Sequence, residues 1–203
     1  MGMATARSAL RAYLAGMFRN ISHTCVKPDH AALFAVASCQ EGYFTTDQAE
    51  AAGYSRPLLD YHLHSGRFIR VRRGVYRLVE SPAGEHEDLV VAWLWSRQAG
   101  VFSHETALAL HQLSDALPAY LHLTLPSTWS RRRLLVPGAL RLHFADVEDG
   151  ERAWVGPVPV TTPIRTLHDC QTAHVAPDLL AQAVRDGLAR GQFSRADLAR
   201  FDA

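Results

Sequence analysis

The sequence has little lysine, few cysteines and no long hydrophobic run. Lys27 is the only lysine, and every other basic residue of the chain is an arginine. The one sustained apolar run, Leu89 to Trp95, is far shorter than the roughly 20 residues that a membrane helix needs. Cys25, Cys39 and Cys170 are too few and too widely spaced for a disulfide framework or a zinc site. We therefore expect a cytoplasmic protein with free thiols and no contact with a membrane.

The sequence signatures of common enzyme classes are absent as well. Neither the phosphate-binding pattern GxxxxGKS/T nor GxGxxG after a strand occurs, which argues against kinases and dinucleotide-binding enzymes. A Vsr-like or restriction-type nuclease usually pairs carboxylates with a lysine, and the acidic run from Asp146 to Asp149 has no lysine beside it. A nuclease is therefore only an alternative, and we expect neither catalysis nor a cofactor.

Eleven histidines raise the question of metal binding or acid–base catalysis. His62 and His64 fall on different faces of a predicted helix. His104 and His111 share a face but lack a third ligand at metal spacing. We therefore predict that the histidines are structural and that the chain holds no metal.

Two short runs contain the residue types of catalytic sites. His168, Asp169 and Cys170 put a base beside a thiol, but neighbours on a helix diverge by about 100° and do not face one another. Ser103, followed by His104 and Glu105, stands where a helix is expected to begin, so we interpret it as a helix cap rather than as a nucleophile. We predict no catalytic residues.

Length and composition favour two small domains. A chain of 203 residues that is 48% hydrophobic can bury a sizeable core. The polar segment 80–84, with its proline and glycine, is the best boundary. We therefore expect a basic leader at 1–28, one domain at 29–79 and another at 85–203. The leader is interpretable as a poorly ordered segment, as a helix that packs on a partner subunit, or as an arm that touches DNA.

Positive charge is concentrated between Tyr54 and Leu78. This segment has six arginines and one acid, Asp60, a local balance of +5 in a chain of net charge +1. The rest of the chain therefore sums to −4. Such asymmetry is typical of a module that neutralises phosphates with one face.

Capping residues and hydrophobic spacing in the first domain predict three helices and a hairpin. Asp29 caps the first helix, Thr46 the second, and Ser55, with Pro57 in the first turn, the third. The expected elements are helices at 29–40, 47–52 and 56–65, an extended piece at 43–45, and strands at 68–71 and 75–78. This order is that of a winged helix-turn-helix.

In such a fold the third helix enters the major groove and the hairpin lies along the DNA backbone. The exposed face of the third helix then offers Arg56, Tyr61 and His64 to the bases. The residues expected to contact the DNA backbone are Ser55, Arg67, Arg70, Arg72, Arg73 and Arg77. The alternative is a solvated helix and a basic hairpin that bind no ligand.

The second domain is expected to be of the α+β class, with helices against a small β-sheet. Its predicted helices are 85–98, 103–111, 177–190 and 194–201, together with one that starts at Thr162 and Pro163 and includes Cys170. Its predicted strands are 121–125, 139–144 and 158–161. Arg131, Arg132 and Arg133 lie in a loop after the first strand. They could form a solvated turn, a second DNA contact, or a surface for an acidic toxin or RNA.

The sequence resembles AbiEi-type antitoxins, the transcription-regulating partners in type IV toxin–antitoxin pairs. The likeness is carried by GYFTTDQA, by SGRFIRVRRGVYRL, and in the second half by SHETALALH, LHLTLP, RLHF and VPVTTPIRTLHD. It implies an N-terminal winged helix that binds double-stranded operator DNA and represses its own operon. It also implies a C-terminal half that counters a nucleotidyltransferase-like toxin. A protein-binding antitoxin without specific DNA reading is the alternative, and both a monomer and a homodimer are compatible with the sequence.

Overall fold

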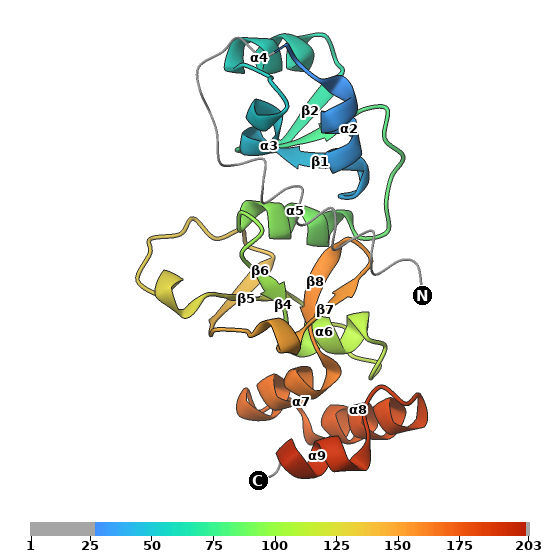
Figure 1. The fold of residues 1–203 in the computed structure, drawn as a ribbon. Helices are drawn as coiled ribbons and strands as arrows, with labels where there is room; N and C mark the ends of the chain where they lie inside the picture. The colour runs from blue at the N-terminus through green and yellow to red at the C-terminus, as the bar shows by residue number, and fades with distance from the viewer. Residues whose placement is uncertain (1–26, 202–203) are drawn as a thin grey trace. The chain divides into compact units, whose positions relative to one another are not determined.

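The computed structural model describes residues 27–201, which form two compact units that divide between Gly84 and Glu85 (Figure 1). The predicted leader, residues 1–28, lies almost wholly outside the described range, as does Cys25. Helices and two sheets make up the described chain, so the fold class is mixed α+β. Within residues 27–201, no helix is long and apolar enough to cross a membrane.

The N-terminal unit packs three helices on a three-stranded antiparallel sheet. Its elements are α2 (His30–Ser38), β1 (Tyr43–Thr45), α3 (Thr46–Ala51), α4 (Arg56–His64), β2 (Phe68–Arg72) and β3 (Val75–Leu78). The strand order β1-β3-β2 puts β3 in the centre and leaves β2 at an edge. Phe44, Tyr54, Phe68 and Tyr76 form the aromatic part of the core, with ring centroids of Phe44 and Phe68 at 5.1 Å.

Each helix of this unit begins at a side-chain cap. Asp29 and Ser55 cap α2 and α4, as the sequence predicts. The prediction that Thr46 caps α3 is wrong by one residue. Thr45 is the cap, because its hydroxyl accepts the N–H of Gln48 while the Gln48 side chain accepts the N–H of Thr45.

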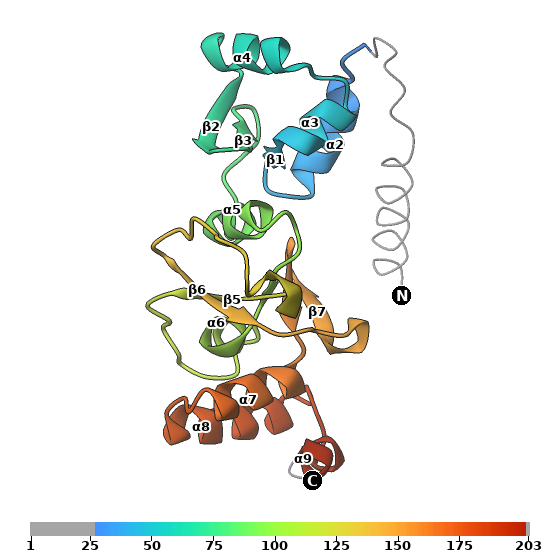
Figure 2. The same cartoon turned by 90° about the vertical axis from the view of Figure 1, so that its left-hand side faces the viewer.

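The C-terminal unit is a mixed five-stranded sheet with helices around it. Its elements are α5 (Glu87–Trp95), β4 (Val101–Phe102), α6 (His104–Leu110), β5 (Leu121–Leu125), the 3₁₀ turn η1 (Ser127–Trp129), β6 (Leu140–Phe144), the 3₁₀ turn η2 (Asp149–Glu151), β7 (Arg152–Val155), β8 (Val158–Thr161), α7 (Pro163–Thr172), α8 (Pro177–Ala189) and α9 (Arg195–Phe201). The strand order is β6-β5-β4-β8-β7. Figures 1 and 2 draw α5 on one side of this sheet and α6 with α7, α8 and α9 on the other.

The structure corrects two expectations for this unit. The sheet gains β4 and β7, which the sequence analysis missed because one is only two residues long and the other has no buried residue. The prediction that the Ser103 side chain caps a helix is also wrong. Ser103 is fully buried, and its hydroxyl lies 2.7 Å from Thr124 Oγ1 and 2.8 Å from His104 Nδ1. A buried hydroxyl needs such partners, because burial without a hydrogen bond is costly.

Candidate nucleic-acid interface

Helix α4 turns one face to the core and the other to solvent. Leu59 and His62 are buried, whereas Arg56, Tyr61 and His64 are exposed, with Tyr61 at 63%. The three predicted base-reading side chains therefore share the open face of one helix. His62 belongs to the core, and burial lowers the pKa of its imidazole.

The geometry of α4 leaves its exposed polar groups able to bind a ligand. His64 Nδ1 lies 2.7 Å from the carbonyl oxygen of Asp60, and a carbonyl only accepts, so Nδ1 carries the proton and Nε2 is left as an acceptor. Arg56 pairs with Glu50 at 3.5 Å, but both side chains are exposed, and such pairs contribute little. Ser55 Oγ accepts the N–H of Leu58 and keeps its own proton for donation.

Strand β2 is an edge strand that only Phe68 anchors in the core; its other four residues are exposed. Pairing with β3 shifts register between Arg70 and Arg72, so Val71 forms a bulge. Gly74 has a φ of +79°, which closes the turn into β3 in a conformation that favours glycine. The strand therefore presents its side chains and its free edge to solvent.

The arginines of this hairpin fall into two groups. Arg67, Arg70, Arg72 and Arg73 are exposed, and none pairs with an acid among residues 27–201. Arg77 differs because it is half-buried: its Nη2 donates to Ser81 O at 3.0 Å, and its guanidinium lies 5.8 Å from the Tyr43 ring centroid. Arg77 therefore holds the unit together, while the other four form a cluster of unneutralised charge.

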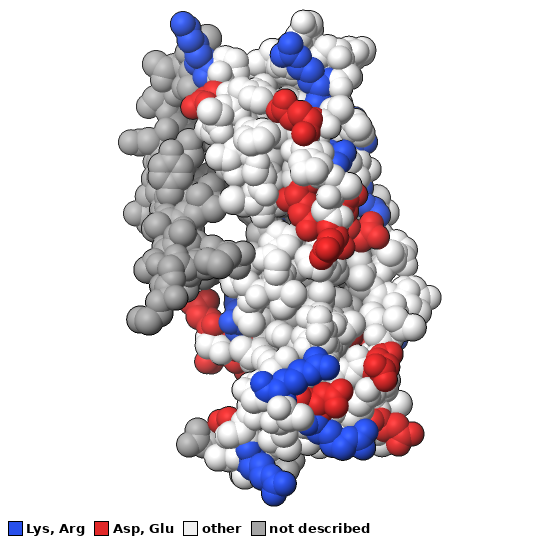
Figure 3. All heavy atoms as spheres, turned by 90° about the vertical axis from the view of Figure 1, so that its right-hand side faces the viewer, with Lys and Arg blue, Asp and Glu red and all other residues white. Residues whose placement is uncertain are grey.

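Basic side chains also occur outside the hairpin. The face in Figure 3 shows basic and acidic side chains interspersed, with no broad area of one sign. Arg131, Arg132 and Arg133 are exposed in the loop after η1, and the Arg132 guanidinium lies over the Trp129 ring at 4.2 Å. One of the three arginines of this predicted second basic patch, Arg132, therefore packs on a residue of its own loop.

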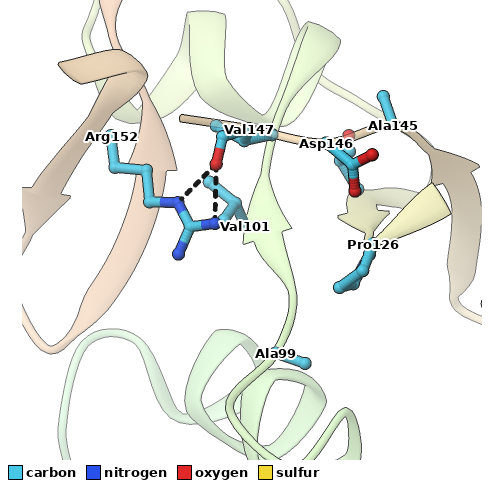
Figure 4. A pocket seen from close by; sticks show the side chains of 8 residues that line it. Ala99, Val101, Pro126, Ala145, Asp146, Val147 and Arg152 are labelled. Atoms are coloured by element: carbon cyan, nitrogen blue, oxygen red, sulfur yellow. Dashed lines mark hydrogen bonds between the residues drawn. The ribbon is translucent and has the colours of Figure 1, made fainter. Parts of the chain in front are cut away.

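The C-terminal unit has a shallow hollow lined by Ala99, Val101, Pro126 and neighbouring side chains (Figure 4). The hollow offers few open polar groups. Arg152 donates from Nε and Nη2 to the carbonyl oxygen of Val147, at 3.1 and 2.7 Å. Asp146, part of the acidic run considered above for a nuclease, accepts from the backbone N and the hydroxyl of Ser127. These groups are already engaged, so the hollow makes a poor ligand site.

Three histidines meet in the C-terminal unit, although they are far apart in the sequence. His104 begins α6, His122 lies on β5 and His143 on β6, and one ring nitrogen of each lies within 4.8 Å of the others. The spacing rules applied to the sequence did not bring His104 together with His122 and His143. His111, the partner considered from the sequence, instead points Nε2 at Thr161 O, at 2.7 Å.

Burial governs the protonation of this part of the unit. Burial, aided by the neighbouring histidines, lowers the pKa of His104 to about 3, and burial lowers the pKa of His143 to about 4. Burial also lowers the pKa of His122. All three imidazoles are therefore neutral at pH 7. Burial raises the pKa of the Cys170 thiol to about 12, which argues against a thiolate nucleophile beside His168.

Comparisons with known proteins relate the N-terminal unit to a family. Residues 32–79 match the model of the family described as "Transcriptional regulator, AbiEi antitoxin". No curated protein matches the chain. Among solved structures, the RV2827C protein from Mycobacterium tuberculosis matches with a TM-score of 0.51 and 14% identity over 84% of this chain and 70% of that chain, a likeness of fold. Over residues 32–79, the N-terminal unit is therefore similar to AbiEi-type antitoxins and transcriptional regulators.

Proposed function

We propose that the N-terminal unit is a winged helix-turn-helix that binds double-stranded operator DNA and represses the operon that encodes the protein. The observation that carries this proposal is the group of four exposed arginines, Arg67, Arg70, Arg72 and Arg73, without an acidic partner among the described residues. Guanidinium groups bind phosphate oxygens through paired donors, so an edge strand that carries them suits a DNA backbone.

Helix α4 supplies the sequence-reading part of the proposal. Arg56 can donate two hydrogen bonds to guanine, and His64 Nε2 can accept from a base amino group. Tyr61 lies beside them with its ring largely in solvent. The N-terminus of α4 adds the backbone N–H of Arg56 and a positive dipole end for a phosphate, since Pro57 has no N–H and the Leu58 N–H is donated to Ser55 Oγ.

Salt dependence of DNA binding tests this proposal. We expect the full chain to bind the duplex upstream of its own gene, with log affinity falling linearly with log salt by about 0.9 per phosphate contact. Changing Arg70, Arg72 and Arg73 to alanine should reduce the slope by about 2.7 and weaken binding about 100-fold or more. For comparison, changing Arg131, Arg132 and Arg133 to alanine in the other unit removes the same charge and should leave the slope unchanged, because the proposal assigns DNA binding to the hairpin. Equal binding by wild type and the hairpin variant would refute the proposal.

We further propose that the C-terminal unit carries the antitoxin activity, against a nucleotidyltransferase-like toxin in the cytoplasm. Leu117 and Leu135 are 95% and 93% exposed, as expected of side chains that a protein partner covers. The hairpin variant separates the two activities in cells. It should lose repression of a reporter but still rescue growth from the toxin, whereas loss of rescue in a folded variant would show that antitoxin activity depends on DNA binding.

A further inference from the structure

The three-histidine cluster of the C-terminal unit has the features of a metal site. Strands β5 and β6 run parallel, and their register places His122 opposite Arg141 and Thr124 opposite His143. Alternate residues of a strand share a face, so His122 and His143 project from the same side of the sheet. His104 joins them from the first turn of α6, and its ring stacks on that of His143 with centroids 3.6 Å apart.

Hydrogen bonds already orient two of the three rings. His122 Nε2 lies 3.2 Å from Glu105 Oε2, which leaves Nδ1 facing His143 Nε2 at 3.1 Å. His104 Nδ1 is held at 2.8 Å by Ser103 Oγ, which leaves its Nε2 without that tie. A metal-binding histidine usually has its second nitrogen bonded to a carboxylate or another fixed polar group. Glu105 and Ser103 fill that role here.

We propose that His104, His122 and His143 bind a divalent transition-metal ion of the Zn²⁺ class, with Glu105 as the positioning residue for His122. Zinc–nitrogen bonds of about 2.0–2.1 Å place tetrahedral ligand nitrogens roughly 3.3 Å apart. The facing nitrogens of His122 and His143 already lie near this spacing, and the ligand nitrogens of all three histidines lie within 4.8 Å of one another. His104 must turn out of its stack on His143, because two stacked rings cannot both aim lone pairs at one ion.

One further observation favours this assignment over an ordinary buried cluster. His104 has a φ of +53°, a left-handed conformation that residues with a side chain rarely adopt. Such strain gathers at functional sites. Three protein ligands leave one position of a tetrahedral ion open for water or a bound group.

Metal titration of the full, tag-free chain tests the proposal. After treatment with EDTA and its removal, we expect isothermal calorimetry to show one saturable Zn²⁺ site. Co²⁺ should give the visible absorption of a tetrahedral ion without the near-ultraviolet band of a thiolate ligand. The site should disappear in His143→Gln, a half-buried position on an edge strand, and weaken about 10-fold or more in Glu105→Gln.

The control is His174→Asn, because His174 is exposed and asparagine tolerates its φ of +56°. This variant should bind Zn²⁺ as the wild type does. Circular dichroism verifies that each variant is folded, and Glu105→Gln decides the matter if His143→Gln does not fold. The proposal is overturned if the wild type shows no saturable site, if a thiolate band appears, or if the folded His143→Gln or Glu105→Gln variant binds with unchanged affinity.

Discussion

Arginine serves opposite purposes in the two units. In the N-terminal unit, Arg70, Arg72 and Arg73 lie in solvent without acidic partners among the described residues. In the C-terminal unit, Arg165 is only 17% exposed and bonds both Glu151 and Asp169, at 2.7 and 2.8 Å. Exposed charge contributes little to folding and is free to meet a ligand, whereas buried charge is committed to the fold. The same contrast holds for histidine, since His64 is exposed and His104 is buried.

The largest expected effect is on stability in the C-terminal unit. Arg165→Ala should lower the free energy of unfolding by about 3 kcal/mol, because it leaves the Asp169 carboxylate buried without its cation. Burial raises the pKa of Asp169, against the opposing effect of Arg165, so this carboxylate depends on its partner. Arg73→Ala should change stability by less than about 0.5 kcal/mol. Urea denaturation of both variants gives the comparison, and similar losses would contradict the proposed division of roles.

The sequence predicted the helices and strands of the N-terminal unit best, because the signals there are local. Ser55 and Pro57 correctly mark the start of α4, and the predicted strands of the arginine-rich hairpin agree with β2 and β3 to within one residue. Alternation of buried and exposed residues around α4 follows directly from helical periodicity. Arg77 shows the limit of this approach, because its bond to Ser81 and its position over Tyr43 depend on how the hairpin folds back.

The histidine cluster could not be predicted by the same means. His122 and His143 are 21 residues apart and meet only because β5 and β6 pair in parallel, in a register that no local pattern specifies. His104 joins them through the start of α6, where Ser103 was expected to cap the helix but bonds Thr124 in the core. Residue spacing along the chain can reveal ligands that lie on one helix or one loop. It cannot reveal a group of side chains that only strand pairing brings together.

Acidification should destabilise the C-terminal unit more than the N-terminal unit, by less than the loss expected for Arg165→Ala. In metal-free protein the pKa of His104 is about 3, below its ordinary value of 6.5. Between these values the unfolded chain binds more protons, so stability is full above pH 6.5 and falls as the pH drops towards 3. At pH 5 His104 alone should cost about 2 kcal/mol.

Hydrogen exchange can be measured at pH 7 and pH 5, with mass spectrometry to resolve the segments. It reports the stability of each unit separately. Protection in β5 and α6 should fall much more than protection in α2 and β3 after correction for the intrinsic effect of pH. His104→Gln should reduce this extra loss, because it removes the titrating group. An equal loss of protection in both units would show that the buried histidines do not set the acid response.

The smallest expected effect concerns the starts of two helices, one in each unit. The side chains of Asp29, Thr45 and Ser55 cap helices of the N-terminal unit, whereas the Thr162 side chain at the start of α7 makes no cap bond. Valine matches threonine in shape but lacks the hydroxyl. Thr45→Val should therefore lower stability by about 1 kcal/mol, through the lost bond to the Gln48 N–H. Thr162→Val should cost less than about 0.5 kcal/mol. Chemical denaturation of both variants measures the difference, and a larger loss at Thr162 would mean that its hydroxyl has a role other than capping.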